Sequence, residues 1–448
     1  MVRAVVRRLL MVFLTLVGRV FFRRIEVIGR DGLPDGPVIL IGNHPNSLLD
    51  PLLIAITVGK PLAFAAKAPL FDQLWIGWVV KTAGGVPIHR RMDNQGGAVD
   101  NSAAFAALDA VLERGEAFGI FPEGISNPGP ELAPLKTGAA RIALGAAQRG
   151  LRPSVVPVGL TYWAKDRMRS RVLVHYGAPI RIPPPRAPLD GEDPDESLRQ
   201  QGRDLTEVFD TALREVTVNA PDFETARALE VLRSSLVQED TELAERAELS
   251  RLVAQAWEDR REQPEMQALL TEAAAYADVL EELDVTDEQL RLEPSRRDWL
   301  LRLAKHWVLL LLWLPLALPG LVLHAPALAT AVVLGRKLSP RDDVLAFTRM
   351  LLVTMGVLLS YLVVTLVVFF GLPWWTNVLA AGWGLVFLML SGWATIRVLE
   401  RQSALRRTAH ATLQLWRWKS FVSFLRGERG ALREKFLALI ADGEGKGF

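Results

Sequence analysis

The chain has 448 residues, which is too long for one ordinary domain and predicts two or three. Half of the residues are hydrophobic and the mean hydropathy is positive, which indicates that part of the chain lies in lipid. The formal net charge of +2 gives no reason to expect nucleic acid as a partner. Because cysteine is absent and the six histidines show no helical metal-ligand spacing, we expect no disulfide, no cysteine nucleophile and no metal site.

The N-terminal segment, residues 1–23, is apolar but carries several arginines. Arg3, Arg7 and Arg8 fall within little more than one helical turn, while Leu, Val and Phe fill the other positions. This pattern predicts an interfacial membrane helix, and a buried core helix is the alternative. The run Leu9–Val17 is similar to the core of a signal peptide, but no Ala-x-Ala-like cleavage site follows it.

Residues 24–190 alternate between short apolar strands and helical stretches. The predicted strands are Arg24–Ile28, Val38–Ile41, Leu62–Ala66, Val86–Ile88, Phe118–Phe121, Ser154–Leu160 and Arg171–Tyr176. The predicted helices are Leu48–Thr57, Phe71–Thr82, Gly97–Arg114 and Thr137–Gln148. Alternation at these lengths predicts an α/β domain, a mixed sheet flanked by helices.

The remaining residues divide into three segments by composition. Residues 191–300 are rich in Ala, Leu, Glu and Arg and predict a charged helical connector. Residues 301–400 predict an α-helical transmembrane region, and residues 401–448 a basic amphipathic tail on the cytoplasmic side.

Two stretches in the transmembrane region, Met350–Leu372 and Val378–Ile396, reach the roughly 20 residues that span a bilayer. The apolar stretch before them, His306–Val333, contains three prolines. We predict that it forms a re-entrant hairpin, since this arrangement places all the basic flanks on the cytoplasmic side. Three or four full spans are the alternative.

A histidine and an aspartate lie close together at the end of the second predicted strand. His44 follows Gly42-Asn43, and Asp50 falls in the first turn of the next helix. The carboxyl ends of strands are where α/β sheets bind ligands. An aspartate that accepts the Nδ1–H of a histidine leaves Nε2 as a free base, so we predict a catalytic dyad for deprotonating an alcohol.

Four sequence blocks, in order, resemble those of the PlsC-like glycerophospholipid acyltransferase family. They are Asn43-His44 with Asp50, Gly84–Arg91, Phe121–Asn127 (which contains Phe121-Pro122-Glu123-Gly124) and Val155–Leu160. Five residues separate His44 from Asp50, one more than in most members, and this spacing resembles the branch of the yeast-type glycerol-3-phosphate acyltransferases.

The resemblance assigns roles to further residues. It implies that Arg90, with Arg91 as a possible substitute, meets the acceptor phosphate. It also implies that Glu123 hydrogen-bonds the glycerol backbone and that Gly124 lets the chain approach the substrate. Lys136, at the start of a predicted helix, is a second candidate phosphate ligand.

The function that the resemblance implies is acyl transfer in phospholipid biosynthesis. An acyl-CoA or acyl-carrier protein would donate the acyl group to glycerol 3-phosphate or to 1-acylglycerol 3-phosphate (lysophosphatidate), with no cofactor. We expect a membrane location, the bacterial inner membrane with the catalytic domain on the cytoplasmic face. The alternatives are another lysophospholipid or an aminoacyl lipid as acceptor, and a catalytically inactive membrane scaffold or transport protein. A hydrolase is less consistent, because no Gly-x-Ser-x-Gly motif is present.

Overall fold

The computed structural model describes residues 2–89, 102–162, 165–184, 186, 193–217, 219–237, 243–283, 285, 287, 290, 296–339, 341–371 and 373–444. The chain forms two compact units. The sheet unit comprises residues 1–226, 238–259 and 341–347, and the helical unit comprises residues 227–237, 260–340 and 348–448. The sheet unit therefore includes one short segment, 341–347, from the C-terminal half of the chain.

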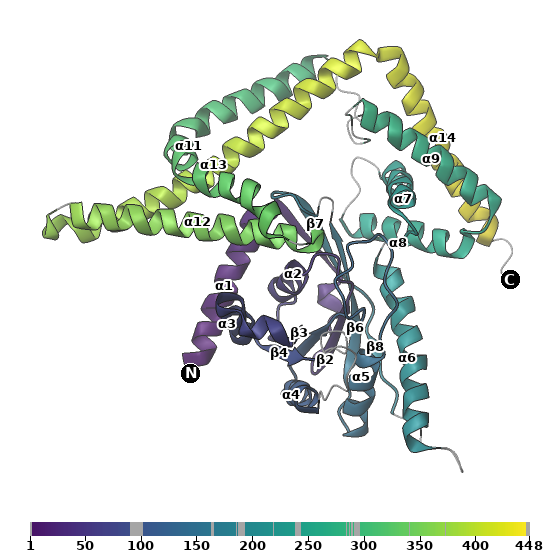
Figure 1. The fold of residues 1–448 in the computed structure, drawn as a ribbon. Helices are drawn as coiled ribbons and strands as arrows, with labels where there is room; N and C mark the ends of the chain where they lie inside the picture. The colour runs from purple at the N-terminus through teal and green to yellow at the C-terminus, as the bar shows by residue number, and fades with distance from the viewer. Residues whose placement is uncertain are drawn as a thin grey trace. The chain divides into compact units, whose positions relative to one another are not determined.

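The described part of the sheet unit contains one mixed sheet of eight strands (Figure 1). Its strands are β1 (Arg24–Ile28), β2 (Val38–Gly42), β3 (Leu62–Lys67), β4 (Gly85–Ile88), β5 (Ala117–Ile120), β6 (Ser154–Tyr162), β7 (Arg171–Tyr176) and β8 (Ile180–Arg181). Their order is β1-β7-β6-β2-β5-β3-β4, and β8 pairs with β6. Pairs are parallel except for β6 with β7 and β6 with β8.

This sheet confirms the predicted α/β fold. All seven predicted strands are present within about two residues of their expected ends, and the two-residue strand β8 was missed. The helices that follow are α2 (Leu49–Thr57), α3 (Leu74–Ala83), α4 (Ser102–Glu113) and α5 (Gly138–Gln148), with short 3₁₀ turns η1 (Arg30–Gly32) and η2 (Ala68–Asp72). The helix predicted over Gly97–Arg114 corresponds to α4, and its predicted start at Gly97 lies outside the described residues.

Alternation along β2 explains why the sheet is covered on both faces. Ile39 and Ile41 belong to a buried cluster with residues of α4 and α5, so these helices cover one face. Leu40, between them, is also buried. Helix α2 packs near β7, where Thr57 Oγ1 and Tyr176 Oη are 2.8 Å apart. The central strand is therefore buried on both sides, as its uninterrupted apolar sequence predicts.

Helix α1 (Val2–Phe21) packs against α2 and α3 through one side only. Its buried side includes Leu10 and Phe21, while Arg7 Nη2 donates to the carbonyl of Leu62 at 2.8 Å. The opposite side exposes a row of large apolar side chains with helical spacing: Val2, Val5, Val6, Leu9, Val12, Phe13 and Leu16. Neighbouring α3 exposes Leu74 and Trp78. Exposed apolar side chains on this scale are typical of a surface that contacts lipid or another protein.

The residues predicted as a helical connector do form helices: α6 (Pro194–Val216), α7 (Phe223–Leu236), α8 (Leu243–Arg260) and α9 (Pro264–Glu282). Helix α6 begins at Asp193, whose carboxylate accepts a hydrogen bond from the backbone N–H of Asp195. Its residues Leu205, Phe209 and Leu213 join the cluster beneath the sheet, because i, i+4 spacing puts them on one face.

The long C-terminal helices are α11 (Arg296–Leu338), α12 (Asp342–Gly371), α13 (Trp374–Arg417) and α14 (Lys419–Glu444), and they belong to the helical unit apart from residues 342–347 at the start of α12. Among the described residues, three helical stretches are long and apolar enough to cross a membrane, namely Arg297–Leu338, Asp342–Gly371 and Val378–His410. Helix α14 packs along α9, with Lys435 Nζ 2.6 Å from Glu272 Oε2.

The predicted re-entrant hairpin is wrong. Pro315, Pro319 and Pro326 all lie inside the single helix α11. Near Pro319, Ser391 of α13 donates its hydroxyl to the Leu316 carbonyl at 2.7 Å and accepts from the Gly320 N–H at 2.7 Å. Those two backbone groups are the ones that an uninterrupted helix would pair with each other. A neighbouring hydroxyl thus satisfies the backbone beside a proline, which is how apolar helices retain prolines without turning back.

Candidate active site

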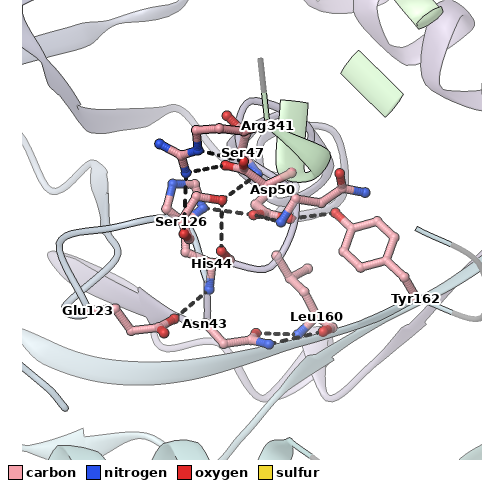
Figure 2. A network of polar contacts seen from close by, with 11 residues as sticks. Asn43, His44, Ser47, Asp50, Glu123, Ser126, Leu160, Tyr162 and Arg341 are labelled. Carbon is pink, nitrogen blue, oxygen red and sulfur yellow. Dashed lines mark hydrogen bonds and ion pairs between the residues drawn. The ribbon is translucent and has the colours of Figure 1, made fainter. Parts of the chain in front are cut away.

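Three neighbouring strands of the sheet bring the candidate residues together. β2 pairs in parallel with β5 on one side and β6 on the other, with Ile41 opposite Ile120 and Gly42 opposite Val158. Their carboxyl ends therefore meet at one edge of the sheet. His44 follows β2, Glu123 follows β5 and Tyr162 ends β6, so residues far apart in the sequence share this edge (Figure 2).

His44 and Asp50 are in direct contact. His44 Nδ1 lies 2.7 Å from Asp50 Oδ2, with the Asp50 side chain fully buried and that of His44 20% exposed. Asp50 reaches back because it lies in the first turn of α2, one short turn after His44. The two predicted dyad residues are thus brought together, with the five-residue spacing accommodated by the turn.

Two further donors fix the Asp50 carboxylate. The backbone N–H of Asn46 donates to Oδ2 at 2.7 Å, and the Tyr162 hydroxyl donates to Oδ1 at 2.6 Å. Burial, followed by the nearby Asp50 charge, raises the pKa of Tyr162 well above its ordinary value, so this hydroxyl keeps its proton. A carboxylate so placed accepts from Nδ1–H, which leaves the His44 Nε2 lone pair available. Nε2 makes no hydrogen bond with any described residue.

Stacking sets the plane of the His44 ring. The ring lies on Phe121 with centroids 4.0 Å apart and planes 6° from parallel, and Phe121 in turn stacks on Phe64. Gly42 permits this arrangement, since a Cβ there would lie 3.1 Å from the Phe121 ring. A fixed ring orientation directs Nε2 to one position, as a general base requires.

The turn that carries His44 is tied to the loop after β5. The Ser126 hydroxyl donates to the His44 carbonyl at 3.1 Å and accepts from the Ser47 N–H at 3.1 Å, and the Asn127 N–H donates to the same carbonyl at 2.8 Å. Ser47 has φ 49°, the left-handed region that non-glycine residues rarely adopt. The local backbone strain is thus held in place by bonds from Ser126.

Glu123 also holds this turn, through hydrogen bonds from backbone N–H groups to its carboxylate. Its Oε1 accepts from the His44 N–H at 2.8 Å and its Oε2 from the Ala133 N–H at 3.0 Å, and its side chain is buried. Burial raises the pKa of Glu123, and these backbone N–H groups oppose that rise. Each carboxylate oxygen thus already binds one backbone amide, so the structure gives Glu123 a part in holding His44.

Gly124 and Lys136 lie against each other at the edge of the site. Gly124 has φ 68°, and a Cβ on it would lie 2.7 Å from Lys136 Nζ. Only glycine combines that backbone conformation with room for the amine. Lys136 is exposed and precedes α5, so its ammonium group is free to reach a bound anion. Its backbone N–H donates to the Pro122 carbonyl at 2.8 Å.

The structure thus brings together His44, Asp50, Glu123, Gly124 and Lys136, whereas Arg90 and Arg91 lie outside the described residues. Within the described ranges, no group of three His, Cys, Asp or Glu side chains could hold a metal ion.

Tyr162 and Lys165 take part in the site although no sequence motif pointed to them, whereas Asn43 and Ser126 lie in the sequence blocks without an assigned role. Asn43 exchanges two hydrogen bonds with the backbone of Leu160, and so joins the ends of β2 and β6. Lys165 accepts from the buried Asn46 amide through its carbonyl, and burial lowers the pKa of its ammonium group. Tyr162 lies at the end of a strand beside β2, and this position was the sequence feature that could have identified it as a residue of the site.

Comparison with known proteins matches both halves of the chain. The family described as Acyltransferase matches residues 24–161, which carry the site. The family described as Glycerol-3-phosphate acyltransferase 2 C-terminal domain matches residues 235–443. Each of these two segments is thus similar to a family of glycerophospholipid acyltransferases.

Three curated relatives illustrate this similarity. Glycerol-3-phosphate O-acyltransferase 2 of Saccharomyces cerevisiae is 34% identical over 30% of this chain and 18% of its own length. Glycerol-3-phosphate O-acyltransferase 1 of the same yeast is 27% identical over 52% of this chain and 31% of its own length. The 1-acyl-sn-glycerol-3-phosphate acyltransferase of Borreliella burgdorferi is 31% identical over 31% of this chain and 51% of its own length. The chain thus spans about half or less of these relatives.

Proposed function

We propose that this protein transfers a fatty acyl group from a thioester, acyl-CoA or acyl-carrier protein, to a hydroxyl of glycerol 3-phosphate. The observation that carries the proposal is the His44–Asp50 contact of 2.7 Å, with a buried carboxylate and an available Nε2. This is the base and orienting half of a catalytic triad, and the acceptor alcohol supplies the nucleophile that the enzyme lacks.

The reaction follows from these positions. His44 Nε2 takes the proton of the acceptor hydroxyl as its oxygen attacks the thioester carbonyl. The tetrahedral intermediate then expels the thiolate, and the imidazolium returns the proton to sulfur, giving an ester and a free thiol. Asp50 stabilises the imidazolium in between, while the bonds from Asn46 and Tyr162 keep the carboxylate in position.

Glycerol 3-phosphate is the preferred acceptor for two reasons. The five-residue spacing between His44 and Asp50 resembles that branch of the family, and two yeast relatives are named glycerol-3-phosphate O-acyltransferases. 1-Acylglycerol 3-phosphate is the second candidate, favoured by the name of the Borreliella relative. Both acceptors present a phosphate, for which Lys136 and Arg90 are the proposed ligands.

A membrane location suits both units separately. The sheet unit exposes an apolar row on α1, and the C-terminal helices include three candidate spans. We propose that the protein resides in a bacterial inner membrane, with the site on the cytoplasmic face, where thioester donors and lipid products meet.

The decisive assay supplies labelled palmitoyl-CoA with either acceptor to membranes that contain the full chain or its His44→Ala variant. Label in lysophosphatidate or in phosphatidate, absent with the variant, identifies the reaction and its acceptor. Product from neither acceptor would contradict the proposal and favour another lipid acceptor or an inactive scaffold.

A further inference from the structure

A residue from the C-terminal half of the chain lies over the loop that supports His44 (Figure 2). Arg341 Nη2 donates to the Ser126 carbonyl at 3.4 Å. Arg341 belongs to the segment between α11 and α12, which is part of the sheet unit. Ser126 in turn binds the carbonyl of His44 and the N–H of Ser47. Arg341 is thus two hydrogen bonds away from the residue proposed as the base.

A buried carboxylate orients this arginine. Asp343 accepts from Arg341 Nε at 2.8 Å and from Nη2 at 2.6 Å, and its side chain is 2% exposed whereas that of Arg341 is 58% exposed. This two-point contact fixes the plane of the guanidinium while leaving one edge in solvent. Nη1 makes no hydrogen bond or ion pair with any described residue, so its two N–H groups can bind an anion.

The loop after β5 carries a cation at three successive points. Lys136 Nζ lies against Gly124, Arg341 binds the carbonyl of Ser126, and Lys165 Nζ donates to the carbonyl of Pro128. The Lys165 amine is engaged by this bond, and Lys136 offers a single point charge. Arg341 differs from both lysines, because Asp343 holds the plane of its guanidinium and Nη1 thereby presents its N–H donors to a phosphate oxygen in a fixed direction.

We propose that Arg341, supplied by the segment between two apolar helices, is a phosphate-binding residue of the acyl-transfer site. The inference rests on the proposed function, because that function supplies phosphate-bearing substrates. It adds a role for the C-terminal half of the chain: the segment 341–347 completes a site that the sheet builds.

Two phosphates have this chemistry, that of glycerol 3-phosphate and those of the CoA donor. Direct binding to the purified full-length protein in lipid nanodiscs distinguishes them. The dissociation constants of glycerol 3-phosphate and of CoA are measured by calorimetry for the wild type, Arg341→Gln and Arg341→Lys. Arg152→Gln is the matched control, since this exposed arginine precedes β6 at the opposite edge of the sheet.

Loss of a charged hydrogen-bonding pair predicts that Arg341→Gln weakens binding of one ligand by about 10- to 100-fold. Arg341→Lys keeps the charge but loses the two-point contact with Asp343 that orients the Nη1 donors, so its affinity should fall between those of the wild type and Arg341→Gln. Weakened glycerol 3-phosphate binding alone assigns the residue to the acceptor, and weakened CoA binding alone assigns it to the donor. Arg152→Gln should bind both ligands as the wild type does.

Three results would overturn the inference. In the first, Arg341→Gln binds both ligands with the affinity of the wild type. In the second, it loses the same affinity for both ligands and also has a lower melting temperature. In the third, the wild type binds neither ligand. The acyl-transfer assay separates this from the proposed function. If the protein transfers acyl groups but Arg341→Gln binds both ligands as tightly as the wild type, only the role of Arg341 is refuted. If Arg341→Gln weakens binding but the wild type transfers no acyl group, only the proposed reaction is refuted.

Discussion

The sheet unit and the helical unit each bury hydroxyl groups in a hydrogen-bonded cluster, but the hydroxyl groups in the two clusters donate to different kinds of acceptor. In the sheet unit, Tyr162 and Asn46 converge on the buried carboxylate of Asp50, which in turn contacts a ring that is partly exposed. In the helical unit, the hydroxyls of Ser391 and Thr395 end on backbone carbonyls of α11. The first cluster therefore positions a reactive nitrogen, and the second satisfies backbone groups between two packed helices.

This contrast separates two uses of buried polarity. Both clusters lower the cost of placing polar atoms away from water. Only the first leaves a titratable atom at the surface of the cluster, His44 Nε2. Substitutions in the first should therefore change the rate of reaction, and substitutions in the second should change stability and leave the rate per folded molecule alone.

The largest expected effect is that of His44→Ala. Removing a general base lowers the turnover number by about 10²- to 10⁴-fold. The His44 ring is partly exposed, so the melting temperature should change little. His89→Ala, which removes an exposed histidine at the end of β4, is the control and should retain full activity. Residual activity of more than a few per cent in His44→Ala would remove this residue from the role of base.

Tyr162→Phe should have the next largest effect. It removes one of the donors that hold Asp50, and the loss of a hydrogen bond to a charged group predicts about a tenfold lower turnover number. Tyr176→Phe is the matched control, because this buried hydroxyl binds Thr57 instead of the dyad. Both variants should lose some stability, so equal turnover numbers for the two would show that Tyr162 is structural only.

Local sequence patterns were sufficient for the strands and for the His44–Asp50 pair. Both depend on residues that are close in the chain. A strand can be predicted from its own run of apolar residues, and Asp50 is six residues from His44. Glu123 and Gly124, by contrast, were singled out by the resemblance to a family, and they occupy one turn after β5. What a single turn or strand determines can be predicted from its own residues.

Contacts between distant residues could not be predicted in this way. Tyr162 lies 112 residues from Asp50, and Arg341 lies 215 residues from Ser126. The hairpin prediction rested on the three prolines and on placing all the basic flanks on one side. Neither could show that the hydroxyl of Ser391, 75 residues after Leu316, satisfies the helix beside Pro319. A proline removes a backbone hydrogen bond from its own helix, which predicts a break there, but a contact with another helix offsets that loss.

Ser391→Ala tests the helical cluster. It removes the bonds to the Leu316 carbonyl and from the Gly320 N–H, and interhelical hydrogen bonds between apolar helices contribute about 0.6 kcal/mol on average, up to about 1.7 kcal/mol. We expect a lower melting temperature in nanodiscs with unchanged turnover. Ser360→Ala, whose hydroxyl binds only carbonyls of its own helix α12, should change less. A loss of turnover in Ser391→Ala without a change in stability would blur the distinction between the clusters.

The smallest effect expected is a pH dependence from Glu123. Burial raises the pKa of this carboxyl above the 4.5 of an exposed glutamate, so the folded protein holds the proton more tightly than the unfolded chain does. Its contribution to stability is therefore greatest at low pH and is lost as the pH rises through the raised pKa. The melting temperature of the wild type should exceed that of Glu123→Gln by the largest margin below pH 4.5, and the margin should narrow above it. Glu131→Gln, at an exposed position, should show a margin that does not vary with pH. A margin that widens as the pH rises would mean that the amides of His44 and Ala133 stabilise the ionised carboxylate by more than burial costs it.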